Sequence, residues 1–141
     1  MSNNQSKPKI THLALKVVDA DQAAKVFKDV FGFIETDRRR DGDHVSLHLT
    51  DGSFDLALVT FDSEHPDSMG GVVGEGPCIH HFGIDVDDTA KFSEELKQAG
   101  AKILTDPTRP DAKTIKFTVP GGGGMAEIAP MDWHKREQGN A

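Results

Sequence analysis

The sequence is poor in cysteine, has no tyrosine and contains no long apolar run. Its single cysteine, Cys78, excludes an internal disulfide and is typical of a reducing compartment, so we expect a cytoplasmic protein. No apolar stretch approaches the roughly 20 residues that cross a bilayer, so no membrane segment is expected. The polar residues 1–8 lack the apolar core of a signal peptide and are expected to form a flexible N-terminal lead.

An excess of positive charge is also missing. The chain has 16 lysine and arginine residues against 23 aspartate and glutamate residues, which gives a net charge of −7. Binding to nucleic acid requires a basic face that neutralises phosphate groups, so nucleic acid is not an expected partner. The length of 141 residues suffices for one compact domain or for two small modules that share a core.

An internal repeat is the main feature that the sequence does contain. Residues 10–19 (ITHLALKVVD) and residues 79–88 (IHHFGIDVDD) share an isoleucine, a histidine two positions later and a valine five positions after that histidine. The two histidines, His12 and His81, are 69 residues apart. Self-similarity at a fixed offset indicates two copies of one structural unit.

A second pair of similar segments lies near the ends of the two copies. Asp55-Leu56-Ala57 corresponds to Glu127-Ile128-Ala129 at an offset of 72 residues, and the additional residues are an ordinary difference in loop length. Four side chains that can bind a metal therefore occupy two pairs of equivalent positions in the predicted repeat: His12 with His81, and Asp55 with Glu127.

Each copy has the hydrophobic pattern of a strand, a helix and three further strands. Apolar residues alternate with period two at residues 10–17 and 44–49, whereas those at residues 23–30 follow helical spacing. We therefore expect an α+β fold of two βαβββ modules that form an open curved sheet around a cavity. The expected segments are a first module at residues 9–61, a glycine-, proline- and serine-rich linker at 62–77, a second module at 78–130 and a C-terminal tail at 131–141.

The candidate ligands lie on strand faces that also carry small residues, because side chains at positions i and i+2 share a face. The pairs are His12 with Ala14, Asp55 with Ala57, His81 with Gly83, and Glu127 with Ala129. A face of polar and small residues forms a poor core but leaves room for a ligand. We expect Ala14, Ala57 and Gly83 to contact a small-molecule substrate.

Two further histidines have different expected roles. His48 shares its strand face with His44, and it could contact substrate or carry a proton, although a solvent-facing position fits the pattern as well. His80 is adjacent to His81 but points to the other face of the strand, so a structural role is expected.

The four candidate ligands supply two imidazoles and two carboxylates. This mixed nitrogen and oxygen donor set suits Zn²⁺, Ni²⁺, Co²⁺, Mn²⁺ or Fe²⁺. Two histidines with one carboxylate also form a facial arrangement that leaves coordination positions open for substrate. The sequence therefore predicts one divalent metal ion per site, held in the cavity.

The order and spacing of these segments resemble the vicinal oxygen chelate superfamily, whose members include glyoxalase I, methylmalonyl-CoA epimerase, fosfomycin-resistance enzymes, extradiol dioxygenases and bleomycin-resistance proteins. The resemblance covers about residues 9–130, and the segments that carry it are Thr11–Val17, Val26–Phe33, His81–Asp88 and Met125–Ile128. It implies metal ligands from the first and last strands of each module, which here are His12, Asp55, His81 and Glu127.

A glyoxalase-like activity implies a metal-dependent lyase or isomerase. In such an enzyme the metal polarises oxygen atoms of the substrate and stabilises an enediolate. A ligating carboxylate, here Glu127, is the catalytic group that moves the proton between adjacent carbons. Asp55 stands where glyoxalase I-like proteins have Glu, so it could bind the metal directly, bind it through water or only line the pocket.

Other members of the superfamily imply other activities. A bleomycin-resistance-like protein would sequester a ligand without metal chemistry, and an epimerase-like enzyme is a further alternative. A fosfomycin-resistance-like enzyme would need phosphonate-binding groups, for which Lys113, Thr114 and Lys116 are candidates. Ring-cleaving dioxygenases depend on a tyrosine near the metal, and the chain has none. An open sheet edge invites a second chain and the superfamily generally dimerises, so a homodimer is expected.

Overall fold

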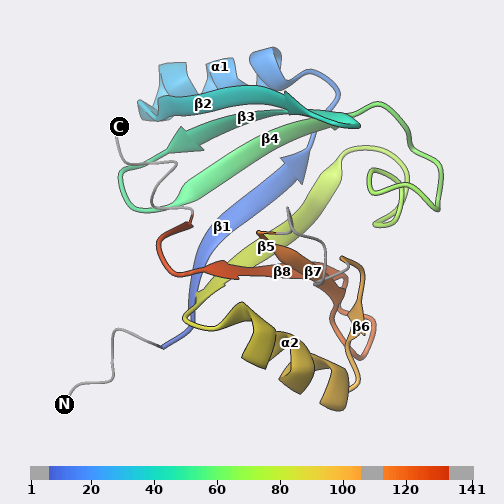
Figure 1. The fold of residues 1–141 in the computed structure, drawn as a ribbon. Coiled ribbons are helices and arrows are strands. Elements are labelled where there is room, and N and C mark those ends of the chain that lie inside the picture. The colour runs from blue at the N-terminus through green and yellow to red at the C-terminus, as the bar shows by residue number, and fades with distance from the viewer. Residues whose placement is uncertain (1–6, 106–112, 134–141) are drawn as a thin grey trace. The chain divides into compact units, whose positions relative to one another are not determined.

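The computed structural model describes residues 7–105 and 113–133 of the chain (Figure 1). The expected N-terminal lead and C-terminal tail fall mostly outside these described residues. None of the helices in the described ranges is long and apolar enough to span a membrane.

The described chain forms two compact units. One spans His12–His80, and the other combines residues 7–11 with residues 81–133. The linker at residues 62–77 is therefore part of the first unit, together with most of the first module.

The first module has the expected βαβββ order. Its elements are β1 (Lys9–Lys16), α1 (Ala20–Phe31), β2 (Ile34–Asp41), β3 (His44–Thr50) and β4 (Asp55–Phe61). The strands lie in the order β2-β3-β4-β1, with β1 parallel to β4 and the other neighbours antiparallel. Figure 1 shows α1 lying along one face of this sheet.

Two capping residues fix the ends of α1. The Asp19 carboxylate accepts a hydrogen bond from the backbone N–H of Gln22 at 3.0 Å, which satisfies one free donor of the first turn. Gly32 adopts a left-handed conformation (φ 72°) that ends the helix. Between these caps, Ala24 and Phe27 pack on leucines of β3 and β4, which are Leu47, Leu49 and Leu58. This core occupies one face of the sheet, whereas the other face carries polar and small residues together with Val59 and Phe61, which pack beside Ala14 and Ala57.

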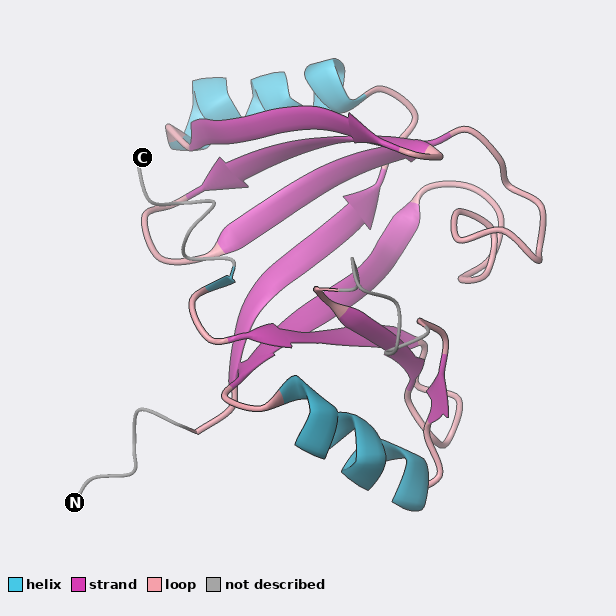
Figure 2. Ribbon diagram, viewed as in Figure 1, coloured by secondary structure: helices cyan, strands magenta, loops and turns pink. Residues whose placement is uncertain are grey.

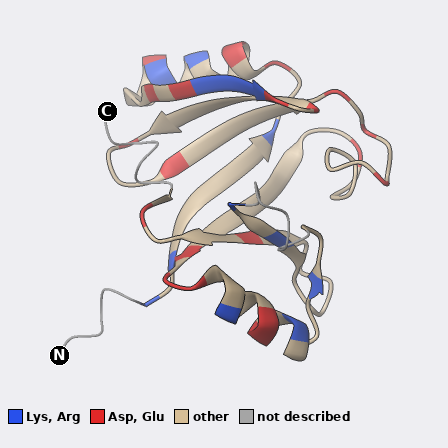
Figure 3. Ribbon diagram, in the orientation of Figure 1, with Lys and Arg blue, Asp and Glu red and all other residues tan. Residues whose placement is uncertain are grey.

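The edge strand β2 is rich in charge (Figure 3). Its three consecutive arginines all form ion pairs: Arg38 with Glu35 and Asp21, Arg39 with Asp37 and Asp41, and Arg40 with Asp62 at the start of the linker. Charged side chains along an edge oppose the addition of a strand from another chain. The argument that an open edge invites a second chain therefore does not apply to β2.

Glu35 is expected to stabilise the first module at neutral pH but not in strong acid. Hydrogen bonds from Arg38 and Lys28 lower the pKa of Glu35 from 4.5 to about 2. A lowered folded-state pKa gives stability that is present above the unfolded-state value and is lost as the pH falls through the folded-state value. Because the ion pairs are partly exposed, Glu35→Gln should lower the free energy of unfolding by only about 1 kcal/mol at pH 7. Urea denaturation at pH 7 and pH 2.5 tests this, and a difference that stays unchanged in acid would contradict the prediction.

The second module repeats the βαβββ order. Its elements are β5 (Cys78–Val86), α2 (Thr89–Gln98), β6 (Lys102–Ile103), β7 (Ile115–Thr118) and β8 (Met125–Pro130). The strands lie in the order β5-β8-β7-β6, with β5 parallel to β8 (Figure 2). The Asp88 carboxylate caps α2 by accepting a hydrogen bond from the N–H of Lys91 at 3.0 Å. The core packed against this helix contains Val86, Ile115, Phe117 and Ile128. The predicted α+β fold of two such modules is confirmed.

The linker at residues 62–77 has no helix or strand, as its composition indicated (Figure 2), but a buried lysine holds it in place. Lys16 of β1 is only 3% exposed. Its Nζ donates hydrogen bonds to the carbonyl oxygens of Gly70 at 2.6 Å and Gly74 at 2.7 Å, and to the Glu64 carboxylate at 2.9 Å. Three acceptors thus satisfy the ammonium group, and in return the linker is tied to β1.

Two glycines allow the linker to fold tightly around this lysine. A Cβ on Gly71 would lie 2.1 Å from the carbonyl oxygen of His65, and a Cβ on Gly70 would lie 2.3 Å from that of Ser63. Both approaches are closer than real Cβ atoms make, so only glycine fits at these positions.

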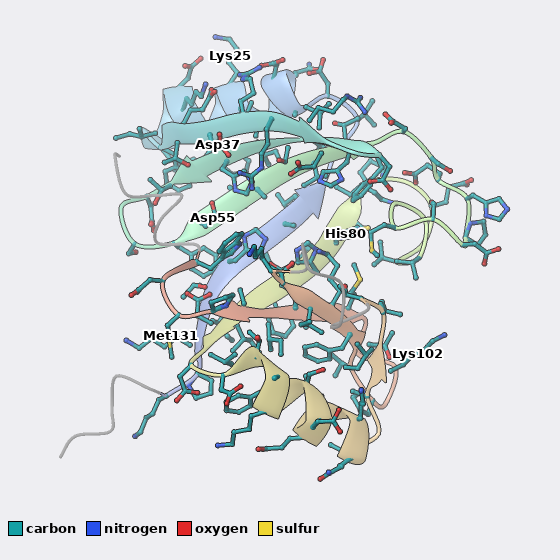
Figure 4. All side chains as sticks on the ribbon, in the orientation of Figure 1. Lys25, Asp37, Asp55, His80, Lys102 and Met131 are labelled. Atoms are coloured by element: carbon teal, nitrogen blue, oxygen red, sulfur yellow. The ribbon has the colours of Figure 1, made fainter. Side chains whose placement is uncertain are left out.

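His80 has the structural role that was expected (Figure 4). Its Nε2 donates a hydrogen bond to the carbonyl oxygen of Met69 at 2.7 Å. Its ring also stacks on Phe61, with ring centroids 4.8 Å apart. The hydrogen bond attaches the linker to the start of β5, and the stacked rings join β4 to the same point.

Candidate functional site

A buried carboxylate organises the polar face of the first module. Asp55 begins β4 (Figure 4), lies opposite His12 in the parallel register of β1 and β4, and is 0% exposed. Its Oδ2 accepts a hydrogen bond from Nδ1 of His12 at 2.5 Å, and its Oδ1 accepts one from Nδ1 of His48 at 2.9 Å. The two imidazole rings are stacked with centroids 6.2 Å apart. Three of the residues predicted for the site therefore form one cluster.

The hydrogen bonds of this cluster fix which ring nitrogens carry protons. Burial by itself raises the pKa of Asp55, but the hydrogen bonds from His12 and His48 outweigh burial and lower the pKa to about 2. The carboxylate is thus ionised at neutral pH and can only accept hydrogen bonds. Each Nδ1 must then be protonated, and in the neutral ring Nε2 is the unprotonated nitrogen. His12 consequently presents Nε2 as the atom that can bind a metal.

A second carboxylate, Glu127 of β8, organises the polar face of the second module. Its Oε1 lies 3.5 Å from Nε2 of His81 on β5 and 3.2 Å from Nζ of Lys116 on β7. Lys116 stands directly opposite Glu127 in the register of β7 and β8. The sequence connected Lys116 only with phosphonate binding. Lys116 alternates along β7 with the buried residues Ile115 and Phe117, so its side chain points to the opposite face of the sheet, which is the face that carries Glu127. This alternation is the sequence signal that could have identified Lys116.

Small residues accompany both clusters, as the strand alternation predicted. Ala14 lies opposite Ala57 in the first module, and Gly83 lies opposite Glu127 in the second. Ala57 also stands opposite His48 in the antiparallel pair of β3 and β4. That Ala14, Ala57 and Gly83 contact a substrate stays a prediction.

The strand registers correct the repeat alignment drawn from the sequence. Glu127 pairs with Gly83, two residues beyond His81. In the first module the residue two positions beyond His12 is Ala14, and Ala14 pairs with Ala57. Asp55 pairs with His12 itself. The structural counterpart of Glu127 is therefore Ala57, and the predicted equivalence of Asp55 with Glu127 is wrong by two residues. A shift of two leaves a side chain on the same strand face, so the hydrophobic pattern could not reveal it.

Comparison with known families gives one match that spans most of the chain. A family model described as the Glyoxalase/Bleomycin resistance protein/Dioxygenase superfamily matches residues 9–126. Among curated proteins, none matches the sequence.

Solved structures resemble the chain in fold. The hypothetical protein BH1468 from Bacillus halodurans C-125 has 17% identity and a TM-score of 0.72, with 88% of this chain and 94% of that chain covered. Methylmalonyl-CoA epimerase from Mycobacterium tuberculosis has 19% identity and a TM-score of 0.69, with 86% of each chain covered. A variant of Streptomyces coelicolor methylmalonyl-CoA epimerase in complex with 2-nitronate-propionyl-CoA has 18% identity and a TM-score of 0.64, with 86% of this chain and 96% of that chain covered.

Proposed function

Because the chain belongs to the glyoxalase/bleomycin resistance protein/dioxygenase superfamily, we propose that it is a metal-dependent enzyme that moves a proton at a carbon next to a carbonyl group. The proposed reaction class is that of a lyase or isomerase of glyoxalase type, and the substrate is a small molecule with neighbouring oxygen atoms. The observation that carries the proposal is a first-strand histidine beside a buried carboxylate in each module, His12 with Asp55 and His81 with Glu127. Proteins of this superfamily commonly form dimers, and we propose a homodimer as well.

The proposed metal ligands are Nε2 of His12, an imidazole nitrogen of His81 and the carboxylate of Glu127. This donor set binds Zn²⁺, Ni²⁺, Co²⁺, Mn²⁺ or Fe²⁺. The side chains fit the task, because Asp55 holds His12 by Nδ1, and Nε2 of His81 faces Oε1 of Glu127 at 3.5 Å. When bound, the ion polarises the carbonyl oxygen of the substrate and stabilises the negative charge that develops there.

Glu127 is the proposed proton carrier. Its carboxylate oxygen lies 3.2 Å from the ammonium group of Lys116, which orients Glu127 and can also bind an anionic group of the substrate. His48 is a second candidate proton carrier, because Asp55 keeps its Nδ1 protonated and makes Nε2 the basic nitrogen.

An epimerase-like activity is the second candidate function, and the presence of two proton carriers favours it. Inversion of a stereocentre needs a base on one side of the carbon and an acid on the other, whereas a glyoxalase-type isomerisation can use one group for both steps. Glu127 and His48 belong to different modules and could serve as such a pair. The methylmalonyl-CoA epimerases named above share the fold of this chain.

Metal content is the first test of the proposal. Protein purified without a metal-affinity tag should hold about one divalent ion per chain by mass spectrometry, and His81→Ala should lose it, because two ligands bind far more weakly than three. His65→Ala removes an exposed linker histidine and should retain the ion, which controls for the loss of any imidazole. No metal in any of these proteins, even after soaking with divalent ions, would favour a metal-free, bleomycin-resistance-like binding protein.

Proton exchange with solvent distinguishes the two candidate activities. The metal-loaded protein is incubated in D₂O with methylmalonyl-CoA or with S-lactoylglutathione, and the product is analysed by NMR. Deuterium at the carbon next to the thioester of only one compound would assign the protein to the epimerase class or to the glyoxalase class, respectively. Exchange in neither compound would argue against both substrates.

A further inference from the structure

We propose that the first module supplies one metal ligand instead of two: Ala57 occupies the position of a fourth ligand, and Asp55 is a positioning residue that orients His12 and His48. This inference rests on the metal site proposed above and specifies its coordination. It departs from the expectation that Asp55 itself ligates the metal.

The first argument is the strand register. In the second module, the ligand Glu127 pairs with the residue two positions beyond His81. The same position in the first module belongs to Ala57, whose partner is Ala14, two positions beyond His12. A methyl group stands where a second carboxylate would complete a symmetric set of four ligands.

The second argument is the direction in which His12 is held. The Asp55 carboxylate contacts Nδ1 of His12, and Nδ1 and Nε2 lie on different sides of the imidazole ring. An ion held at Nε2 would therefore be separated from Asp55 by the imidazole ring. The orientation that prepares His12 as a ligand excludes Asp55 from the same coordination sphere.

The third argument is that both oxygens of Asp55 already have partners. Oδ2 accepts from His12, and Nδ1 of His48 lies 2.9 Å from Oδ1 and 3.1 Å from Oδ2. Turning the carboxylate towards an ion would deprive two buried imidazole N–H groups of their acceptor. Carboxylates that hold a ligating histidine in this way also raise the basicity of the ligand.

The consequence concerns the substrate. Three protein ligands, which are His12, His81 and Glu127, would hold the ion and would leave more of it accessible to the oxygen atoms of a chelating substrate than four ligands would. His48, the second candidate proton carrier, stands opposite Ala57 in the β3–β4 register.

The positioning role is tested by NMR of the imidazole protons. Wild-type protein labelled with ¹⁵N should show two slowly exchanging Nδ1–H signals, from His12 and His48, that persist when Zn²⁺ is added. Asp55→Asn has one acceptor oxygen instead of two and should lose at least one of the signals, whereas Asp67→Asn, which changes an exposed linker residue, should keep both. Disappearance of the signals in wild-type protein on addition of Zn²⁺ would mean that the ion captures Asp55, and would overturn the proposal.

The ligand count is tested with Co²⁺ as the probe. Asp55→Asn should still bind about one ion per chain, with an affinity reduced by about 10–100-fold. Ala57→Glu should bind Co²⁺ at least about tenfold more tightly than Ala57→Met, which controls for the size of the new side chain. The comparison at position 57 remains decisive if Asp55→Asn fails to fold.

The possible outcomes separate this inference from the proposed function. Equal Co²⁺ affinities of Ala57→Glu and Ala57→Met, or complete loss of the ion from folded Asp55→Asn, would overturn the inference alone. A wild-type protein that binds neither Co²⁺ nor Zn²⁺ would overturn the proposed function. The inference about the number of ligands, which rests on that function, would then be overturned as well.

Discussion

Glu127→Gln is expected to reduce proton exchange on the substrate by about 10²–10⁴-fold, because an amide of the same shape cannot take up the proton. The amide oxygen of glutamine is still a weak metal ligand, so part of the metal should stay bound. Glu127→Ala, which removes the donor altogether, should lose both the metal and the activity. Deuterium incorporation measures the first effect, and metal content by mass spectrometry measures the second.

Glu95→Gln is the matched control for this prediction. Glu95 lies on α2 of the same module, is exposed, and undergoes the same chemical change as Glu127. Its substitution should leave exchange and metal content unchanged. If Glu127→Gln kept full exchange activity, proton transfer would have to be assigned to another group, of which His48 is the first to test.

Lys16→Met should cause the largest loss of stability, about 3 kcal/mol, because it removes a buried ammonium and leaves three acceptors without their donor. The value lies at the low end of the range for broken buried pairs, since the Glu64 side chain is 39% exposed and can be rehydrated. Urea denaturation measures the loss. Amide hydrogen exchange should also become faster in the linker. The amides to follow are those of Gly71 and Val72, which donate to the carbonyl oxygen of Ser68 in the wild-type protein.

Lys25→Met controls for the loss of a lysine from the same module. Lys25 lies on α1 with a side chain that is 75% exposed, and its only role in the structure of the first module is an ion pair with Asp29. This variant should change the free energy of unfolding by less than about 0.5 kcal/mol. An equally small effect of Lys16→Met would show that the linker is stable without its anchor.

Local signals in the sequence predicted the elements of the fold well. The N-caps Asp19 and Asp88 show how local these determinants are, because an N-cap depends only on a side chain and a backbone N–H a few residues away. The alternation of polar and apolar residues likewise predicted which strand faces carry the candidate ligands. Both signals act over a few positions and need no knowledge of the rest of the chain.

Relations between distant strands were predicted less well. The alternation has a period of two, so it could not distinguish Asp55 from Ala57 as the counterpart of Glu127, and only the register of β1 with β4 separates them. The role of Lys16 was hidden for a different reason. Two of its three acceptors are backbone carbonyls of Gly70 and Gly74, and every residue type supplies a carbonyl.

The ion-paired arginines of β2 affect the tendency of the protein to aggregate at high concentration. The outer backbone groups of an edge strand can template fibril growth, in which identical segments stack in register. In a parallel stack of β2, each arginine would lie beside its own copy, and the ion pairs of Arg38, Arg39 and Arg40 would have to be desolvated or broken. Assembly through this edge is therefore disfavoured even at high concentration.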